Sequence, residues 1–241
     1  MSTHDVAAFF ASLSQDLLAE RDEDPTLERI AERALEVVQS ADACALTLRR
    51  RRGRLETVAS TSPVASQADQ LQYELGEGPC TDTATHDEPY LVVDTADDPR
   101  WPAWGPRAAA LGMRSLISVQ LSGSALGEPR GPLGAMNLYA SRPGAFEGDD
   151  LDLALIYATH AANALTSARL VTGLEVAMHS RHLIGVAQGI LMQRYDLTLE
   201  QSFRALQRYS SNANIKVRDL ALLVLQERTL PADYERPDPA R

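Results

Sequence analysis

The sequence predicts an α+β fold followed by a compact all-helical unit at the C-terminal end, and the periodicity of the apolar residues carries this prediction. Helical spacing comes first, in residues 5–20 and 26–40. Period-two runs typical of strands then follow at 44–50, 55–61, 90–94, 114–122 and 133–140, with one helical stretch near 103–111. Because helices and strands do not alternate regularly, a mostly antiparallel sheet with flanking helices is favoured over a parallel one.

A long helix is expected after the last strand. It begins near Asp149 and continues to about Leu174 or beyond, since no proline or glycine interrupts residues 149–172. Apolar residues three and four apart form a short, alanine-rich seam: Leu151, Ala154, Ala158, Ala161, Leu165 and Ala168. Such a seam permits a second helix to approach closely, so a dimer contact is favoured over packing on the protein's own sheet. Without a flexible linker, the unit that follows is expected to be coupled rigidly to this helix.

Three short helices are expected in residues 181–228. The second opens with a capping-box pattern of Thr198 and Gln201, and Asn212 and Asn214 mark a turn before the third. The apolar faces consist of Leu183, Ile184, Ala187, Ile190 and Leu191 in the first helix, Leu199, Phe203 and Leu206 in the second, and Val217, Leu220, Ala221 and Val224 in the third. Residues 229–241 contain three prolines and are expected to form a disordered tail.

Composition and charge restrict the class of protein. The 241 residues are 44% hydrophobic and 23% charged, which is ordinary for a globular protein. No apolar run approaches the roughly 18 residues of a membrane span, and two distant cysteines indicate neither a disulfide framework nor a zinc site. A cytoplasmic protein without membrane contact is therefore expected. Residues 1–180 carry 14 arginines against 26 acidic residues, whereas residues 181–228 carry seven basic against four acidic ones, so any contact with a polyanion is expected at the C-terminal end.

Catalytic patterns fit poorly. The five histidines are scattered, and His179 and His182, although three residues apart, have no further ligands nearby to complete a metal site. The Gly76–Gly78 segment is too short for a dinucleotide loop, and the single lysine, Lys216, does not belong to a phosphate-binding loop. No catalytic residue, metal or cofactor is expected, and the protein is not expected to be an enzyme.

A small-molecule pocket is one interpretation of the segments GEGPC (76–80) and DPRWPAW (98–104). Aromatic walls with a few polar groups are typical of ligand sites, and the candidate residues are Cys80, Tyr90, Asp94, Arg100, Trp101 and Trp104. The favoured alternative is that the two tryptophans cap the core with their indole N–H groups satisfied. Four consecutive arginines, Arg49–Arg52, are interpreted as a device that keeps an edge strand soluble rather than as a nucleic-acid patch.

The helix expected at 181–194 has an unusual polar side. On a helical wheel Arg181, Gly185, Gln188 and Met192 lie opposite the apolar face, and Gly189 lies beside them. A glycine inside a helix costs about 1 kcal/mol relative to alanine, so two of them suggest that something approaches the backbone closely. Arginine, glutamine and methionine suit a nucleobase or a phosphate. Contact between helices through the glycines is the competing interpretation.

The motifs in this region resemble a known family. SRHLIGVAQGILMQRY (180–195) followed by QSFRALQRYSSNANIKVRDLA (201–221) resembles the ANTAR family of three-helix RNA-binding modules in bacterial antitermination regulators. Upstream, LGEGPC, DPRWPAW, RSLISVQL and LGAMNLYA are similar to the GAF sensor domain in the version joined to ANTAR in actinobacteria. The resemblance implies a GAF-like antiparallel sheet, a connecting helix and a three-helix ANTAR bundle.

The resemblance also implies a partner and a site. ANTAR proteins act as dimers on paired stem-loops in nascent transcripts and so prevent formation of a terminator. Carried over by position, the candidate RNA-binding residues are Arg181, Ala187, Gln188, Gly189, Met192, Arg194, Ser210, Asn214, Lys216 and Arg218. Two residues depart from the family pattern: Gln188 stands where a lysine is common, and Ser202 where an alanine precedes the phenylalanine. Loss of a lysine removes a charge directed at phosphate.

We therefore expect a dimeric transcription antiterminator with a GAF sensor in residues 1–170, ending in a connecting helix at about 149–178, and an ANTAR domain in residues 175–228. An unidentified small molecule is an expected partner of the GAF domain. The alternative is a ligand-sensing signalling protein that acts through protein–protein contacts of its C-terminal helices. Salt dependence separates the two, because binding to RNA weakens steeply as salt rises.

Overall fold

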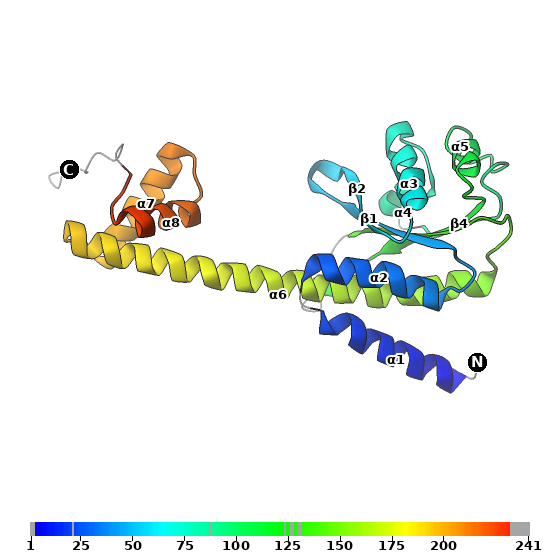
Figure 1. Ribbon diagram of the computed structural model, residues 1–241, viewed down its shortest axis with the longest axis horizontal. Coiled ribbons are helices and arrows are strands. Elements are labelled where there is room, and N and C mark those ends of the chain that lie inside the picture. The colour runs from blue at the N-terminus through cyan, green and yellow to red at the C-terminus, as the bar shows by residue number, and fades with distance from the viewer. Residues whose placement is uncertain are drawn as a thin grey trace. The chain divides into compact units, whose positions relative to one another are not determined.

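The computed structural model describes residues 3–20, 22–86, 88–122, 124–125, 128–129 and 132–231, with side chains described from Phe9 onward except at 124–125 and 128–129. The chain divides into two compact units, the first ending at Thr172 and the second beginning at Gly173 (Figure 1). One helix, α6 (Gly148–Tyr195), contributes to both. Each unit is considered by itself.

The first unit is built on a five-stranded antiparallel sheet in the order β2-β1-β7-β4-β3. The strands are β1 (Ala43–Arg49), β2 (Leu55–Ser60), β3 (Tyr90–Val92), β4 (Ser115–Leu121) and β7 (Gly134–Ala140). Asn137 on the central strand pairs with Ala45 on one side and Ser118 on the other. Two short strands, β5 (Ser124–Ala125) and β6 (Glu128–Pro129), pair separately. The predicted α+β class with an antiparallel sheet is confirmed.

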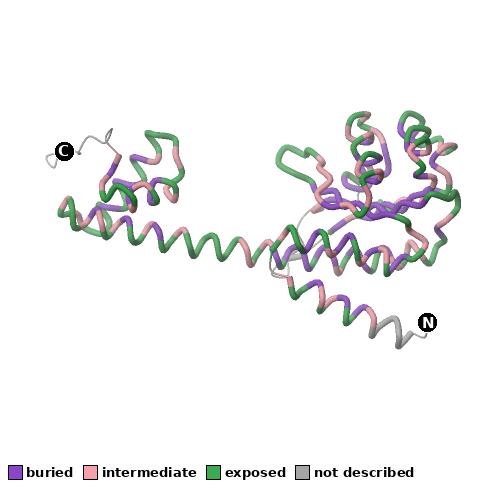
Figure 2. The backbone as a smooth tube through the Cα atoms, viewed as in Figure 1, coloured by how far each residue is buried: buried purple, intermediate pink, exposed green. Residues whose placement is uncertain are grey.

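Helices cover both faces of this sheet (Figure 1). On one face lie α2 (Glu23–Val37) and the first half of α6, with α1 (Thr3–Ala19) outside them, and on the other lie α3 (Pro63–Leu75), α4 (Pro79–His86) and α5 (Gly105–Ala110). The central strands are buried on both sides, so β7 is buried along its whole length (Figure 2). Alternate side chains of each strand enter two separate apolar cores, one under each helical layer.

The alanine-rich seam of α6 packs inside the first unit. Ala154, Ala158, Ala161, Leu165 and Ala168 are buried against the sheet and its neighbouring helices. The hydroxyl of Tyr157, on the same face, donates to the backbone oxygen of Ile30 on α2 at 2.8 Å. The prediction that this seam forms a dimer contact is therefore wrong, because small side chains serve here to bring α6 close to its own domain.

The arginine run lies where a sheet edge needs protection. Arg49–Arg52 are exposed around the turn η1 (Arg51–Gly53), which connects β1 to the edge strand β2. The Nε atom of Arg50 lies 2.9 Å from a carboxylate oxygen of Glu56. This location suits the interpretation as an edge-strand device, which stays a prediction.

The second unit consists of the C-terminal part of α6, α7 (Leu199–Ala213) and α8 (Val217–Glu227). All three helices contribute to one core, formed by Leu183, Ala187, Leu191, Leu206, Tyr209, Leu220, Ala221 and Val224. Leu230 is also buried in this core, so the start of the expected tail (229–241) packs on the unit. Residues 232–241 of the expected tail lie outside the described residues.

Two details of α7 differ from the sequence interpretation. Its buried residues are Ser202, Ala205, Leu206 and Tyr209, so Leu199 and Phe203 lie at the margin of that face and are exposed. Asn212 belongs to the helix, and the turn is made by Asn214 alone, which takes a left-handed conformation with φ 52°. Asparagine tolerates this conformation better than most residues, which explains its place at the helix end.

The capping box that opens α7 offers a stability test. The Thr198 Oγ1 accepts from the backbone N–H of Gln201 at 3.2 Å, and the Gln201 Oε1 accepts from the backbone N–H of Thr198 at 2.8 Å. Removing such a cap costs about 1 kcal/mol. We expect Thr198→Ala to lower the free energy of opening of the α7 amides by that amount in native-state hydrogen exchange, whereas Thr198→Ser leaves it unchanged. Equal exchange in both variants would show that the cap contributes nothing.

Candidate nucleic-acid interface

The glycine side of α6 is open in the second unit. We use this name for the face that carries Arg181, Gly185, Gly189 and Met192. Both glycines are exposed, and a Cβ atom added at either one meets no other atom within 4 Å. The competing interpretation, contact between helices through the glycines, therefore does not apply within the described part of the chain, and no packing there compensates for the low helix propensity of these two residues.

Gln188 lies at the border between this side and α7. Its Nε2 donates to the backbone oxygen of Leu199 at 3.0 Å and lies 3.4 Å from the Oγ of Ser202. The two residues that depart from the family pattern therefore meet in space. The amide of Gln188 connects the start of α7 to the C-terminal part of α6, a contact between helices that sequence spacing does not reveal.

Two other candidates lie on a different side of α6. Ala187 is fully buried in the core between the three helices, so it packs and has no surface with which to contact RNA. Arg194 is exposed in the last turn, but at about 100° per residue it lies roughly 140° around the helix from Arg181. Of the α6 candidates, Arg181, Gly189, Met192 and the edge residue Gln188 share one side.

The remaining candidates gather at the turn between α7 and α8. The Oγ of Ser210 donates to the backbone oxygen of Ile215 at 2.5 Å, and the Ile215 N–H donates to the Ser210 oxygen at 3.1 Å. These bonds close the turn that presents Asn214 and Lys216, both exposed. Arg218 is half-buried, with its Nε 3.2 Å from a carboxylate oxygen of Asp219. Ser210 thus holds the turn, while Lys216 is the exposed cation.

The six residues proposed for a ligand pocket in the first unit divide into buried core residues and residues held by ion pairs and ring contacts. Cys80, Trp101 and Trp104 are core residues with almost no exposed surface. The indole of Trp104 donates to the backbone oxygen of Ala68 at 2.9 Å, and that of Trp101 to the carboxylate of Asp82 at 2.8 Å. The favoured alternative, tryptophans that cap the core with satisfied N–H groups, is confirmed.

The other three form ion pairs and stacking contacts. Arg100 lies over the ring of Trp101 at 4.4 Å and that of Tyr90 at 5.6 Å, and Asp98 binds it through both carboxylate oxygens. Asp94 pairs with Arg114 in the same bidentate way, and the hydrogen bonds from that arginine lower the pKa of the Asp94 carboxyl. Arg100 thus contacts Tyr90 while Asp94 pairs separately with Arg114, and both sets of contacts hold the loops around α5.

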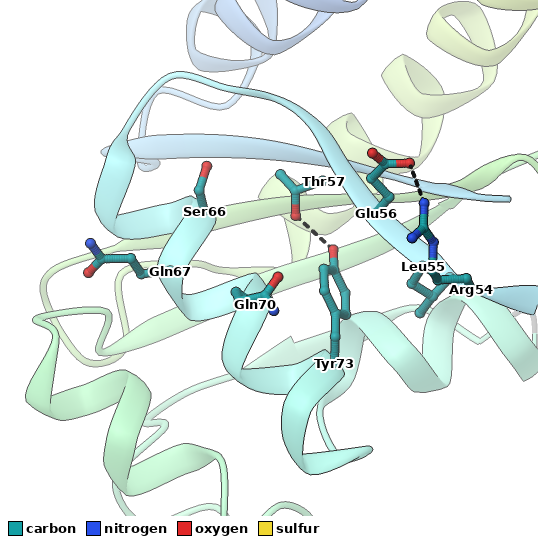
Figure 3. Close-up of a pocket in the computed structure, with 8 residues that line it drawn as sticks. All are labelled: Arg54, Leu55, Glu56, Thr57, Ser66, Gln67, Gln70 and Tyr73. Atoms are coloured by element: carbon teal, nitrogen blue, oxygen red, sulfur yellow. Dashed lines mark hydrogen bonds and ion pairs between the residues drawn. The ribbon is translucent and has the colours of Figure 1, made fainter.

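Two cavities of the first unit are lined by other residues. One of about 560 Å³ lies between strand β2 and helix α3 (Figure 3) and is lined by Arg54, Leu55, Glu56, Thr57, Ser66, Gln67, Gln70 and Tyr73. Another of about 330 Å³ lies among α1, α2 and α6, beside Phe9 and Phe10. None of the six predicted pocket residues lines either one. Sequence reasoning missed the first cavity because its lining is polar and resembles an ordinary exposed helix face.

Two family models match the chain. The first is the GAF domain, and it matches residues 20–166. The chain belongs to the GAF domain family. The second is the ANTAR domain, which matches residues 172–225 and includes the open glycine side of α6 and the turn of Lys216. The resemblance of the sequence motifs to both domains is confirmed.

Solved structures share the GAF fold. The GAF domain of a phosphoenolpyruvate-protein phosphotransferase from Coxiella burnetii matches with a TM-score of 0.54 at 19% identity, covering 72% of this chain and 99% of that one. The corresponding domain from Acinetobacter gives 0.52 at 14% identity, covering 71% and 98%. A free methionine-R-sulfoxide reductase from Neisseria meningitidis, in complex with its substrate, gives 0.50 at 16%, covering 66% and 86%. At these identities the likeness concerns the fold alone. No curated protein matches the chain.

A GAF sensor and an ANTAR output make the protein a signalling regulator of transcription. Both are sensor and regulatory domains rather than catalytic ones. Within the described ranges, no three His, Cys, Asp or Glu side chains gather as ligands for a metal ion. None of the helices in the described part of the chain is long and apolar enough to cross a membrane.

Proposed function

We propose that this protein is a transcription antiterminator whose ANTAR domain binds RNA along the glycine side of α6. The observation that carries the proposal is the pair of exposed glycines at 185 and 189, with open space where their side chains would be. Each costs the helix about 1 kcal/mol relative to alanine. That cost is offset if a nucleic-acid backbone lies closer to the helix than a methyl group would permit.

The neighbours of the glycines suit a single-stranded RNA loop. Arg181 is exposed on the same side and offers a planar set of donors, and Met192 offers a polarizable surface for a base. Proteins read RNA sequence mainly in loops whose bases are unstacked. Lys216, at the start of α8, supplies a cation for a phosphate. The targets we propose are paired stem-loops in nascent transcripts, whose capture prevents formation of a terminator.

We propose that the protein acts as a homodimer. The alanine seam of α6 is occupied within the GAF domain, but in the second unit Leu174 and Met178 of the same helix are 56% and 70% exposed. They are four residues apart and so lie along one stripe of the helix. A second copy of the helix would cover this stripe and supply the second RNA-binding face that paired stem-loops require.

An electrophoretic binding assay with a two-stem-loop RNA tests the function. We expect Arg181→Ala and Lys216→Ala each to weaken binding about tenfold and to reduce its salt dependence by about one ion. Arg107→Ala on α5, an exposed arginine of the GAF domain, removes the same charge and is expected to change neither quantity. Equal binding by wild type and both ANTAR variants would contradict the assigned surface.

A second candidate function is regulation through protein–protein contact. Exposed apolar side chains in the second unit favour it, namely Leu199 at 62%, Phe203 at 38% and Leu222 at 40% exposure. An apolar helix interface depends little on salt, whereas RNA binding weakens steeply between 50 and 200 mM salt. Binding whose affinity does not change with salt would support this second function over the first.

A further inference from the structure

A carboxylate lies buried in the GAF domain, and no cation among the described residues contributes to its electrostatics. Asp69 projects from α3 towards the sheet and has no exposed surface. Its Oδ1 accepts from the Tyr139 hydroxyl at 2.5 Å and from the Asn137 amide at 2.9 Å. Its Oδ2 lies 3.1 Å from the hydroxyl of Thr57 and 3.3 Å from that of Thr47. All four partners are neutral, so nothing among them balances a negative charge.

The oxygens on the Oδ2 side form a closed ring. The hydroxyl oxygen of Tyr73 lies 2.7 Å from Thr47 Oγ1 and 2.8 Å from Thr57 Oγ1, and the second of these contacts is visible in Figure 3. Asp69 Oδ2, Thr47, Tyr73 and Thr57 are thus joined by four oxygen–oxygen contacts. Each hydrogen bond needs one hydrogen. The three hydroxyl groups supply three, so one contact has no hydrogen unless Asp69 carries a proton on Oδ2.

We propose that Asp69 is a proton-binding site of the GAF domain, which holds a proton on Oδ2 at slightly acid pH and releases it as the pH rises towards neutrality. The bound proton completes the ring, so that each of the four oxygens donates once and accepts once within it, and Thr47 Oγ1 accepts in addition from the Cys80 thiol at 3.2 Å. Release breaks the Oδ2–H bond, leaves the electron pair on the carboxylate and passes the proton to water. The ring then holds three hydrogens for four contacts, and its weakest contact is lost.

Electrostatics supports this assignment. Burial raises the pKa of Asp69 to about 6, and the hydrogen bonds from Tyr139, the two threonines and Asn137 only partly oppose that rise. The titratable groups around it are Tyr73, Tyr139, Cys80 and Cys44, and burial raises the pKa of each of these. They therefore stay neutral throughout the range in which Asp69 titrates, and the carboxyl changes charge alone.

The ring opens towards the cavity between β2 and α3. Thr57 and Tyr73 belong both to the ring and to the cavity wall (Figure 3). The charged residues of that wall, Arg54 and Glu56, lie 3.6 Å apart and offset each other. Loss of the proton therefore changes the hydrogen bonds that the hydroxyl groups of Thr57 and Tyr73 make within the ring. The hydrogen bonds that these two groups can offer to a molecule in the cavity then depend on whether Asp69 carries a proton.

Infrared difference spectroscopy on the full-length protein tests the site. We expect a carboxylic-acid carbonyl band that is present at pH 5, lost by pH 8 with a midpoint near 6, and absent from Asp69→Asn. Tyr73→Phe removes two of the four ring contacts. Only the acid form has enough hydrogens to make all four, so the substitution destabilises the acid form more than the carboxylate and is expected to shift the midpoint to lower pH. A midpoint at or below 4 in the wild type, or an unchanged band in Asp69→Asn, would overturn the proposal.

Unfolding gives a second readout that does not depend on RNA. Both tryptophans lie in the GAF domain, so their fluorescence reports its unfolding. A raised pKa in the folded state means that stability is greatest at low pH and falls as pH rises through 6. With a folded value near 6 and an ordinary value near 3.8, the unfolding constant of the wild type is expected to rise about tenfold from pH 5 to pH 8 relative to Asp69→Asn. A ratio that does not change with pH would contradict the proposal.

Discussion

Replacing both Gly185 and Gly189 by alanine is expected to make the ANTAR domain more stable and its RNA binding weaker. Space is open at both positions, so each methyl group adds helix stability of about 1 kcal/mol without a clash. In the complex the same methyl groups stand where we place the RNA backbone. We expect native-state hydrogen exchange of the α6 amides to report the gain, and the affinity for a two-stem-loop RNA to fall at least tenfold.

A third glycine of α6 provides the matched control. Gly173 is also exposed, and a Cβ atom there also meets nothing within 4 Å, but it lies two turns before Arg181. Gly173→Ala is therefore expected to stabilise the helix to the same extent and to leave RNA binding unchanged. If the double variant gains stability but binds RNA as tightly as the wild type, the RNA backbone does not lie against these two glycines.

The largest loss of stability is expected from Trp104→Ala in the GAF domain. The side chain has no exposed surface, and its indole N–H donates a hydrogen bond to the backbone oxygen of Ala68. Its ring makes an edge-to-face contact with the ring of Trp101 at a centroid distance of 6.4 Å. Truncation of a buried tryptophan costs about 3–5 kcal/mol. We expect denaturant unfolding, followed by the fluorescence of Trp101, to show a loss in this range.

Trp104→Phe keeps most of the buried ring but loses the hydrogen bond, so a smaller cost is expected. A loss below about 1 kcal/mol for Trp104→Ala would instead indicate that the residue lines an accessible pocket, as the ligand-pocket interpretation holds. The two substitutions together therefore separate a core tryptophan from a ligand-binding one.

The fold was predictable from sequence because its strands and helices differ clearly in period. The runs around Leu46, Ile117 and Leu138 alternate between two buried faces, and antiparallel pairing follows from the order of the elements. The alanine seam of α6 was ambiguous for a physical reason. Small side chains permit close approach of any helix or sheet, and only the folded chain reveals that the partner is its own domain.

The candidate site was predictable in part. The exposed face of Arg181, Gly185 and Gly189 follows from helical geometry, and the structure leaves it open. The burial of Ala187 does not follow from the motif, because a residue can be typical of a family through packing as well as through contact. The contact of Gln188 with Ser202 joins residues 14 apart, and its existence depends on the angle at which α7 returns along α6.

Asp69 could not be found from sequence. An aspartate in a polar helix is usually exposed, and here the neighbouring Gln67 and Gln70 are exposed while Asp69 faces inward. Its partners come from three strands, β1, β2 and β7, which only the sheet brings together. Polar clusters built from distant segments leave no local pattern.

Oxidation of methionines with and without RNA tests the central claim most directly. Met192 lies on the glycine side, whereas Met178, on the same helix, is 70% exposed in the single chain and lies where we place the dimer contact, which is present with and without RNA. In wild-type protein saturated with a two-stem-loop RNA, we expect hydroxyl radicals to oxidise Met192 several-fold more slowly than in free protein, with no change at Met178. An unchanged rate at Met192 in the saturated complex would mean that the transcript lies elsewhere.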